Sequence, residues 1–146
     1  MIEIDASWNV LYDYTNKMDT IQLTIILRKD RYTCGVFQGV YPSDKLPTSV
    51  LSFLALFIAI VDTSDKPGTH WVAFYFTKER EGEFFDSYGL PRSNYTGRFS
   101  LFLKNNSISW KFKFKTLQSI DSKVCEHYCL YFVLFRLILP YFAKLA

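Results

Sequence analysis

Two apolar strands joined by a short polar loop constrain the fold of this chain more than any other feature of its sequence. Residues 71–76 read WVAFYF, residues 83–86 read EFFD, and the segment TKEREG separates them. With the loop at residues 77–81, Phe76 pairs with Gly82 in an antiparallel hairpin. A sheet around this hairpin suits a chain in which 18% of the residues are aromatic, because aromatic side chains favour strands.

The register of the hairpin determines which polar side chains meet at its open end. Counting back from the loop places Val72 opposite Asp86, and His70 then becomes the diagonal neighbour of Asp86 on the same face. Diagonal neighbours lie about 7 to 8 Å apart at their α-carbons, within reach of an imidazole and a carboxylate. A slip of one residue would separate the two side chains, so their contact depends on this register.

Helical segments are expected on either side of the hairpin in sequence. A helix is expected over residues 19–31, with Asp19 as its cap and basic residues at its C-terminal end. Its apolar stripe is expected from Ile21, Ile25 and either Ile26 or Leu27. Residues 87–99 are expected to form a loop before a short element that begins at Leu101.

Further strands are expected before and after the hairpin. Residues 57–62 (FIAIVD) have the composition of a buried central strand, although the apolar run 48–58 also suits a helix. Residues 34–47 contain two glycines and two prolines, which predicts turns around a short strand. Residues 110–115 (WKFKFK) alternate, so their lysines share one face. We interpret this face as solvent-exposed or as protection of a sheet edge, with phosphate binding as the alternative.

Composition indicates one intracellular domain without a membrane span. The three cysteines have no regular spacing, and the N-terminus (MIEIDASWNV) lacks the apolar segment of a signal peptide, so we expect a cytoplasmic or nuclear protein that is not secreted. The longest apolar runs, residues 50–61 and 128–139, are too short to cross a bilayer. The net charge of +3 does not by itself indicate a nucleic-acid-binding protein.

Residues 117–135 are predicted to contain a buried helix with a cysteine in its first turn. Asp121 and Ser122 are favourable capping residues, and the residues that follow are apolar on most faces. Cys125 would then lie near the positive end of the helix dipole, which stabilises a thiolate. A cysteine in an apolar helix is more often a small core residue, so this segment alone leaves both interpretations open.

Four side chains together supply what thiol-based acyl transfer requires. His70 would take the proton of the Cys125 thiol and later donate it to the leaving amine. Asp86 would hold the imidazole in the useful tautomer. Gln118, seven positions before Cys125, would donate an N–H to the oxyanion together with the backbone N–H of Cys125.

Two other acids are candidates for the role of Asp86, which is to orient the imidazole of His70. Asp62 precedes a turn and Glu83 begins a strand, so we interpret both as ordinary surface residues. Asp86 could itself simply cap the turn at the end of its strand, and its catalytic role is therefore a hypothesis.

A metal site is a weaker interpretation of the same region. His127 and Cys129 could join Cys125 and His70 as ligands, but residues 125 and 127 of a helix point to different faces. The sequence contains neither a CxxC nor an HExxH motif. We expect no metal and no other cofactor, and we interpret Cys129 as a core residue.

The order histidine, acid, glutamine, cysteine occurs here in three segments: PGTHWVAFYF, EFFDSYG and LQSIDSKVCEHYCLYF. Together they closely resemble the adenovirus-type cysteine endopeptidases (adenains) and their relatives in DNA viruses and large viral-like DNA transposons. The resemblance extends over residues 34–135 and includes FQGVYPSDKLP and IVDTSDKPGTHW. More distantly, the chain is similar to the ubiquitin-like-protein-specific proteases.

This resemblance implies a papain-like α+β fold for residues 1–146, with the nucleophile helix packed on a small mixed or antiparallel sheet. It implies cleavage of precursor or capsid-type proteins by Cys125, His70, Asp86 and Gln118. DNA and a short peptide stimulate the viral members, so both are candidate partners, whereas no membrane partner is implied. The first alternative is a protease that removes ubiquitin-like proteins by the same chemistry.

Two departures from the family pattern bear on activity. The family has glycine directly after the nucleophile, whereas this chain has Glu126, whose bulk and negative charge would oppose a developing oxyanion. The second alternative is therefore a pseudo-protease that keeps the fold as a binding module. The sequence also ends 21 residues after Cys125, as expected of a minimal or C-terminally truncated version.

Overall fold

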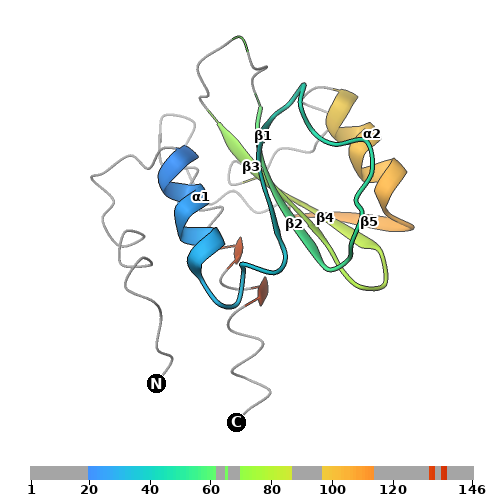
Figure 1. The fold of residues 1–146 in the computed structure, drawn as a ribbon. Coiled ribbons are helices and arrows are strands. Elements are labelled where there is room, and N and C mark those ends of the chain that lie inside the picture. The colour runs from blue at the N-terminus through green and yellow to red at the C-terminus, as the bar shows by residue number, and fades with distance from the viewer. Residues whose placement is uncertain are drawn as a thin grey trace.

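The protein has a mixed α+β architecture in the computed structural model, which describes residues 20–61, 65, 70–86, 97–113, 132–133 and 136–137 (Figure 1). Two helices and five strands lie in these ranges. In chain order they are α1 (Thr20–Lys29), β1 (Phe37–Pro42), β2 (Ala55–Ile60), β3 (Trp71–Phe76), β4 (Glu81–Phe85), α2 (Gly97–Asn106) and β5 (Ser109–Lys113).

A five-stranded mixed sheet in the order β1-β2-β3-β4-β5 is the centre of the fold. β1 is parallel to β2, and β4 is parallel to β5, whereas β2–β3 and β3–β4 are antiparallel. Parallel neighbours need a crossover connection, which contains α2 between β4 and β5. Between β1 and β2 the connection is the irregular segment 43–54.

The two helices cover opposite faces of the sheet, and an apolar core lies on each face (Figure 1). Successive strand residues contribute to the two cores in turn, because side chains alternate across a strand. The α1-side core contains Leu23, Ile26, Leu27, Phe37, Leu56, Ile58, Trp71, Ala73, Tyr75, Phe85, Phe132 and Val133. The α2-side core contains Ala55, Phe57, Ala59, Val72, Phe74, Phe76, Phe84, Phe99, Phe102 and Leu103.

Aromatic pairs fasten α2 to the centre of the sheet. The ring centroid of Phe102 lies 5.0 Å from that of Phe57 and 5.1 Å from that of Phe74, with interplanar angles of 81° and 86°. Edge-to-face pairs of this kind are favourable because the positive ring edge meets the negative ring face. The helix on this side is therefore held by apolar and aromatic packing.

The hairpin register predicted from the sequence is confirmed. β3 occupies residues 71–76, and Phe76 pairs with Gly82. β4 begins at Glu81, two residues earlier than predicted, because the turn uses only residues 77–80. Arg80 closes this turn with a φ of 63°, in the left-handed region.

The predicted helix near the N-terminus is confirmed as α1, but only part of its predicted apolar stripe is buried. Ile21 and Ile25 are 69% and 46% exposed, whereas Leu23, Ile26 and Leu27 are buried. α1 is apolar on more than one side, so its period alone does not identify the side that faces the sheet. The proposed cap Asp19 lies outside the described residues.

Two further elements differ from the sequence predictions. Residues 48–58 do not form a helix: β2 begins at Ala55, and its type agrees with the predicted strand. α2 begins at Gly97 in a region predicted to be loop up to residue 99. Its buried residues, Phe99, Phe102, Leu103 and Asn106, follow a helical period whose last member is polar. Neither described helix has the length and apolar character needed to cross a bilayer.

Candidate active site

A buried histidine–aspartate pair lies at the open end of the β3–β4 hairpin. His70 directly precedes β3, and Asp86 directly follows β4. The His70 Nε2 atom lies 2.7 Å from Asp86 Oδ1, and the two residues are 7% and 0% exposed. The pairing of Ala73 with Phe85 continues the predicted register towards these residues. The expected meeting of imidazole and carboxylate is therefore confirmed, while their catalytic roles stay a prediction.

The chemistry of the two groups indicates how the proton is arranged between them. A buried carboxylate needs a polar partner, and an ionised carboxylate can only accept hydrogen bonds. The Nε2 atom of His70 therefore carries the proton and donates it to Asp86 in a charge-assisted hydrogen bond. In this tautomer Nδ1 is the basic nitrogen of the ring, as a general base requires.

Packing around the hairpin fixes the position of the pair. The backbone carbonyl of His70 accepts a hydrogen bond from the Val61 N–H at 3.0 Å, which links it to the end of β2. Trp71, next in sequence, is buried in the α1-side core. Phe85, which precedes Asp86, stacks on Phe132 with centroids 4.8 Å apart and an interplanar angle of 10°. Both polar side chains are thus attached to rigid elements.

Glu83 is a buried acid, and its interpretation as a surface residue is wrong. It is 1% exposed, and its Oε2 atom lies 2.7 Å from Arg136 Nε. Its Oε1 atom lies 3.3 Å from Lys111 Nζ. Because β4 starts earlier than predicted, Glu83 lies in the middle of the strand and shares a face with Phe85. Sequence reasoning missed this cluster, whose signal was a charged residue within an apolar strand.

Of the two candidate acids that the structure describes, Asp86 and Glu83, it is Asp86 that contacts His70. The ionic contacts of Glu83 are to Lys111 and Arg136. Asp62 lies outside the described residues. The choice of Asp86 therefore agrees with the geometry of the described part of the chain.

Burial and neighbouring charges also change the pKa of Tyr75, which lies beside Glu83. Tyr75 is the cross-strand partner of Glu83, and the guanidinium carbon of Arg136 lies 5.1 Å from its ring centroid. Burial raises the pKa of Tyr75 above its ordinary value of 10.0, the positive charge of Arg136 lowers it, and Glu83 and Glu79 raise it further. The net direction is upward, so Tyr75 keeps its proton at neutral pH.

The first lysine of the predicted alternating strand has an ionic partner. Lys111 is exposed and reaches Glu83 from β5, on the edge of the sheet. Its position on the face of Glu83 agrees with the predicted alternation, and Trp110 precedes it in the same strand. Ion pairing explains this lysine without a nucleic acid, and a role for the other lysines stays a prediction.

The remaining predicted site residues, Cys125 and Gln118, lie outside the described residues. The same is true of Glu126, His127 and Cys129. Of the chain that follows Cys125, the structure describes residues 132–133 and 136–137, which have helical backbone geometry. Within the described part of the chain, no group of three or more histidine, cysteine or acidic side chains is arranged to hold a metal ion.

Cys34 gives an internal reference for thiol chemistry. It is a free, exposed cysteine in the turn between α1 and β1. Its Sγ atom lies 3.8 Å from the backbone carbonyl of Arg31. A comparison of its reactivity with that of Cys125 therefore distinguishes an ordinary exposed thiol from an activated one.

Comparisons with known proteins leave the chain without a family assignment. No protein-family model matches the sequence, and no curated protein matches it significantly. The residues themselves and their geometry are therefore the basis for any functional conclusion.

Proposed function

We propose that the protein is a cysteine endopeptidase with a papain-like fold of the adenain type. Cys125 is the nucleophile, His70 the general base, and Asp86 the group that orients the imidazole. The main support is the 2.7 Å contact between His70 Nε2 and Asp86 Oδ1 at a buried site. The five-stranded sheet with helices on both faces is compatible with this fold class.

The proposed reaction begins with proton transfer. His70 Nδ1 takes the proton from the Cys125 thiol, and the resulting thiolate attacks the carbonyl carbon of a peptide bond. The side-chain N–H of Gln118 and the backbone N–H of Cys125 stabilise the oxyanion of the tetrahedral intermediate. Asp86 stabilises the imidazolium through the Nε2 contact.

The second half of the reaction regenerates the enzyme. The His70 imidazolium donates its proton to the leaving amine, the C–N bond breaks, and a thioester joins the substrate to Cys125. His70 then takes a proton from a water molecule, which attacks the thioester. Collapse of the second intermediate releases the carboxylic acid and returns the proton to the thiol, so no cofactor is required.

Precursor or capsid-type proteins are the proposed substrates, and DNA and a short peptide are candidate activators. All three come from the resemblance of the sequence segments to adenains. The cytoplasm or nucleus suits this chemistry, because a reducing setting keeps the Cys125 thiol available. A deconjugating activity on ubiquitin-like proteins would use the same residues. Cleavage of a ubiquitin-like substrate would distinguish it from the endopeptidase.

Glu126 favours a second candidate function, a pseudo-protease that binds other proteins. Its carboxylate directly follows the nucleophile and would repel a developing oxyanion. The variant Glu126→Gly separates the two functions. An endopeptidase is expected to keep or increase its turnover in this variant, whereas a binding module has no peptidase activity before or after the change.

Selective alkylation tests the proposed nucleophile without a known substrate. Wild-type protein is treated with limiting iodoacetamide at several pH values, and the labelled cysteines are identified by mass spectrometry. Cys125 should react faster than Cys34 and Cys129 at neutral pH, and His70→Ala should remove this advantage. Equal labelling of the three cysteines in the folded wild type would contradict the proposal.

A further inference from the structure

Glu83 has an environment that packing alone does not explain. A carboxylate is costly to bury unless charged or hydrogen-bonding groups surround it. Glu83 is buried in the middle of β4, where the neighbouring residue Phe84 belongs to the α2-side core. Its charge is balanced by Arg136 at 2.7 Å and by Lys111 at 3.3 Å. This charged cluster therefore forms a specific contact inside an otherwise apolar face.

Arg136 connects two parts of the chain that are far apart in sequence. Its Nε atom contacts Glu83 of β4, and its guanidinium group lies over the ring of Tyr75 in β3. Glu83 and Tyr75 are paired across the two strands, so one side chain binds both halves of the hairpin. Arg136 also follows the proposed nucleophile Cys125 by eleven positions.

The open end of the same hairpin carries His70 and Asp86. Asp86 is three residues after Glu83, and His70 is five residues before Tyr75. The Arg136 contact is therefore made on the rigid hairpin that also holds His70 and Asp86. A shift of the C-terminal segment on this hairpin would change where that segment lies relative to the pair.

Apolar packing and one aromatic stack attach the residues around Arg136 to the α1-side core. Phe132 stacks on Phe85, and Val133 is fully buried in the α1-side core. The hydrophobic part of these contacts is non-directional. The ion pair adds a more demanding contact, because a displaced Arg136 would leave the buried carboxylate of Glu83 less well compensated.

We propose that the Glu83–Arg136 ion pair positions the C-terminal segment on the β3–β4 hairpin so that Cys125 reaches His70. This inference rests on the proposed protease function and names Glu83 and Arg136 as positioning residues that act through Cys125. Lys111 compensates part of the charge of Glu83 from the exposed edge of the sheet and does not hold the segment.

The double variant Glu83→Leu with Arg136→Met distinguishes a role in positioning Cys125 from a role in stabilising the fold. Replacing a buried ion pair by apolar residues of similar size often preserves stability, because the desolvation cost disappears. The variant should therefore keep its melting temperature. Its rate of Cys125 alkylation at neutral pH and its kcat should fall roughly 10- to 100-fold, since a small misplacement of reacting groups is enough for such a loss. KM should change little.

Two single variants make the test independent of how the double variant folds. Glu83→Gln keeps the shape of the side chain but removes its charge, and Arg136→Lys keeps the charge but loses the planar guanidinium group. Both should lower kcat and shift the pH profile of Cys125 alkylation towards that of Cys34. Lys111→Met is the matched control, and its alkylation profile should stay within about twofold of the wild type.

The results distinguish this inference from the proposed function. A wild type whose Cys125 alkylation does not depend on His70 would overturn the protease function, and the positioning role with it. A wild type with His70-dependent alkylation, combined with folded Glu83 and Arg136 variants whose profiles equal the wild type, would overturn only the positioning role.

Discussion

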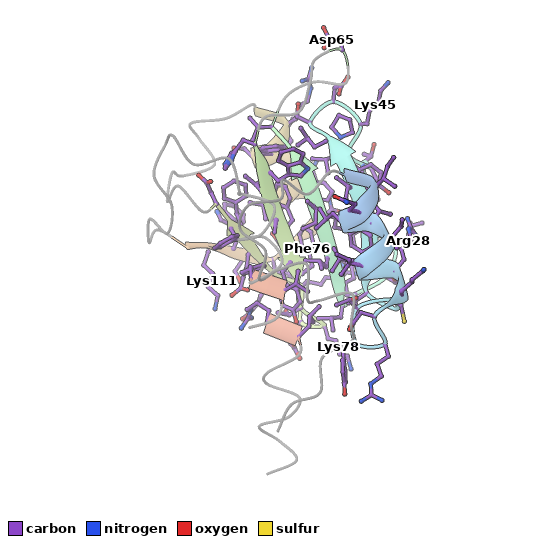
Figure 2. The ribbon with its side chains drawn as sticks, turned by 90° about the vertical axis from the view of Figure 1, so that its left-hand side faces the viewer. Arg28, Lys45, Asp65, Phe76, Lys78 and Lys111 are labelled. Atoms are coloured by element: carbon purple, nitrogen blue, oxygen red, sulfur yellow. The ribbon has the colours of Figure 1, made fainter. Side chains whose placement is uncertain are left out.

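The two ends of the β3–β4 hairpin contain similar polar groups in opposite environments. At the closed end, Lys78, Glu79 and Arg80 are exposed to solvent. At the open end, His70 and Asp86 are buried and in contact. Figure 2 shows Lys78 of the closed end far from Asp65, a residue of the β2–β3 connection.

Burial, more than residue type, determines how strongly a charged group constrains its neighbours. An exposed charge is stabilised by water and interacts weakly with its neighbours. A buried acid must have a partner, and that partner is then held in one orientation and one protonation state. The buried Asp86 holds the imidazole of His70 in one orientation through their contact. The exposed Glu79 does not constrain the turn in this way. Substitutions of the same type at the two ends should therefore have very different effects.

The largest effect is expected from His70→Ala. Without a general base, kcat should fall on the order of 10⁶-fold, as for the loss of a catalytic histidine in a serine protease. Lys78→Ala at the closed end is the matched control and should leave kcat unchanged. Steady-state peptidase assays on both folded variants check this, and a residual rate close to wild type in His70→Ala would contradict the assignment.

Asp86→Asn should have the next largest effect. An amide can donate a hydrogen bond to Nε2, which would favour the wrong tautomer of His70 and lower kcat about 10⁴-fold. Glu79→Gln makes the same acid-to-amide change in an exposed position and should have no effect on turnover. Similar losses in the two variants would show that burial of the pair has no catalytic importance.

Gln118→Ala should lower kcat about 10²- to 10³-fold, because one oxyanion donor is lost. The rate of Cys125 alkylation should stay near the wild-type value, since alkylation forms no oxyanion. A parallel assay of turnover and alkylation checks this separation. Loss of both activities would indicate misfolding and would contradict the assigned role.

A smaller effect, on the free energy of unfolding, is expected from Tyr75 in the hairpin. Its pKa is raised in the folded protein, so above pH 10 the native state holds a proton that the unfolded chain releases. The free energy of unfolding should therefore decrease as the pH rises above about 10. Urea unfolding of Tyr75→Phe should show a weaker decrease than the wild type. Equal decreases would show that burial of this hydroxyl does not affect stability.

The smallest effect is expected for Arg80→Gly at the closed end. Glycine tolerates the φ of 63°, but the change removes the contact between the Arg80 guanidinium and the Phe53 ring at 4.8 Å. The two contributions oppose each other, so the free energy of unfolding should change by less than about 1 kcal/mol. Thermal unfolding and peptidase assays check that stability and turnover are both nearly unchanged.

The sequence predicted the parts of the fold that depend on local pattern. The run WVAFYF gave both the bounds of β3 and, with the loop length, the pairing of Phe76 with Gly82. The contact between His70 and Asp86 followed from that register. These features were predictable because alternation and turn length act over a few residues.

Features that depend on distant partners were not predictable in the same way. Burial of Glu83 is possible because Arg136, 53 positions later, reaches the same strand. The buried face of α1 depends on the location of the sheet. Only a short element from Leu101 was predicted where α2 begins at Gly97. Asn106, the buried polar residue at the end of α2, accepts a hydrogen bond from the distant Val50 N–H at 2.8 Å.

We propose that Cys125 acts together with the His70–Asp86 pair. A crystal structure of the protein trapped with a thiol-reactive peptide inhibitor tests this arrangement. We expect a covalent bond from the inhibitor to the Cys125 sulfur, with that sulfur within hydrogen-bond reach of His70 Nδ1. Modification of another cysteine, or a Cys125 sulfur separated from His70 by the sheet, would contradict it.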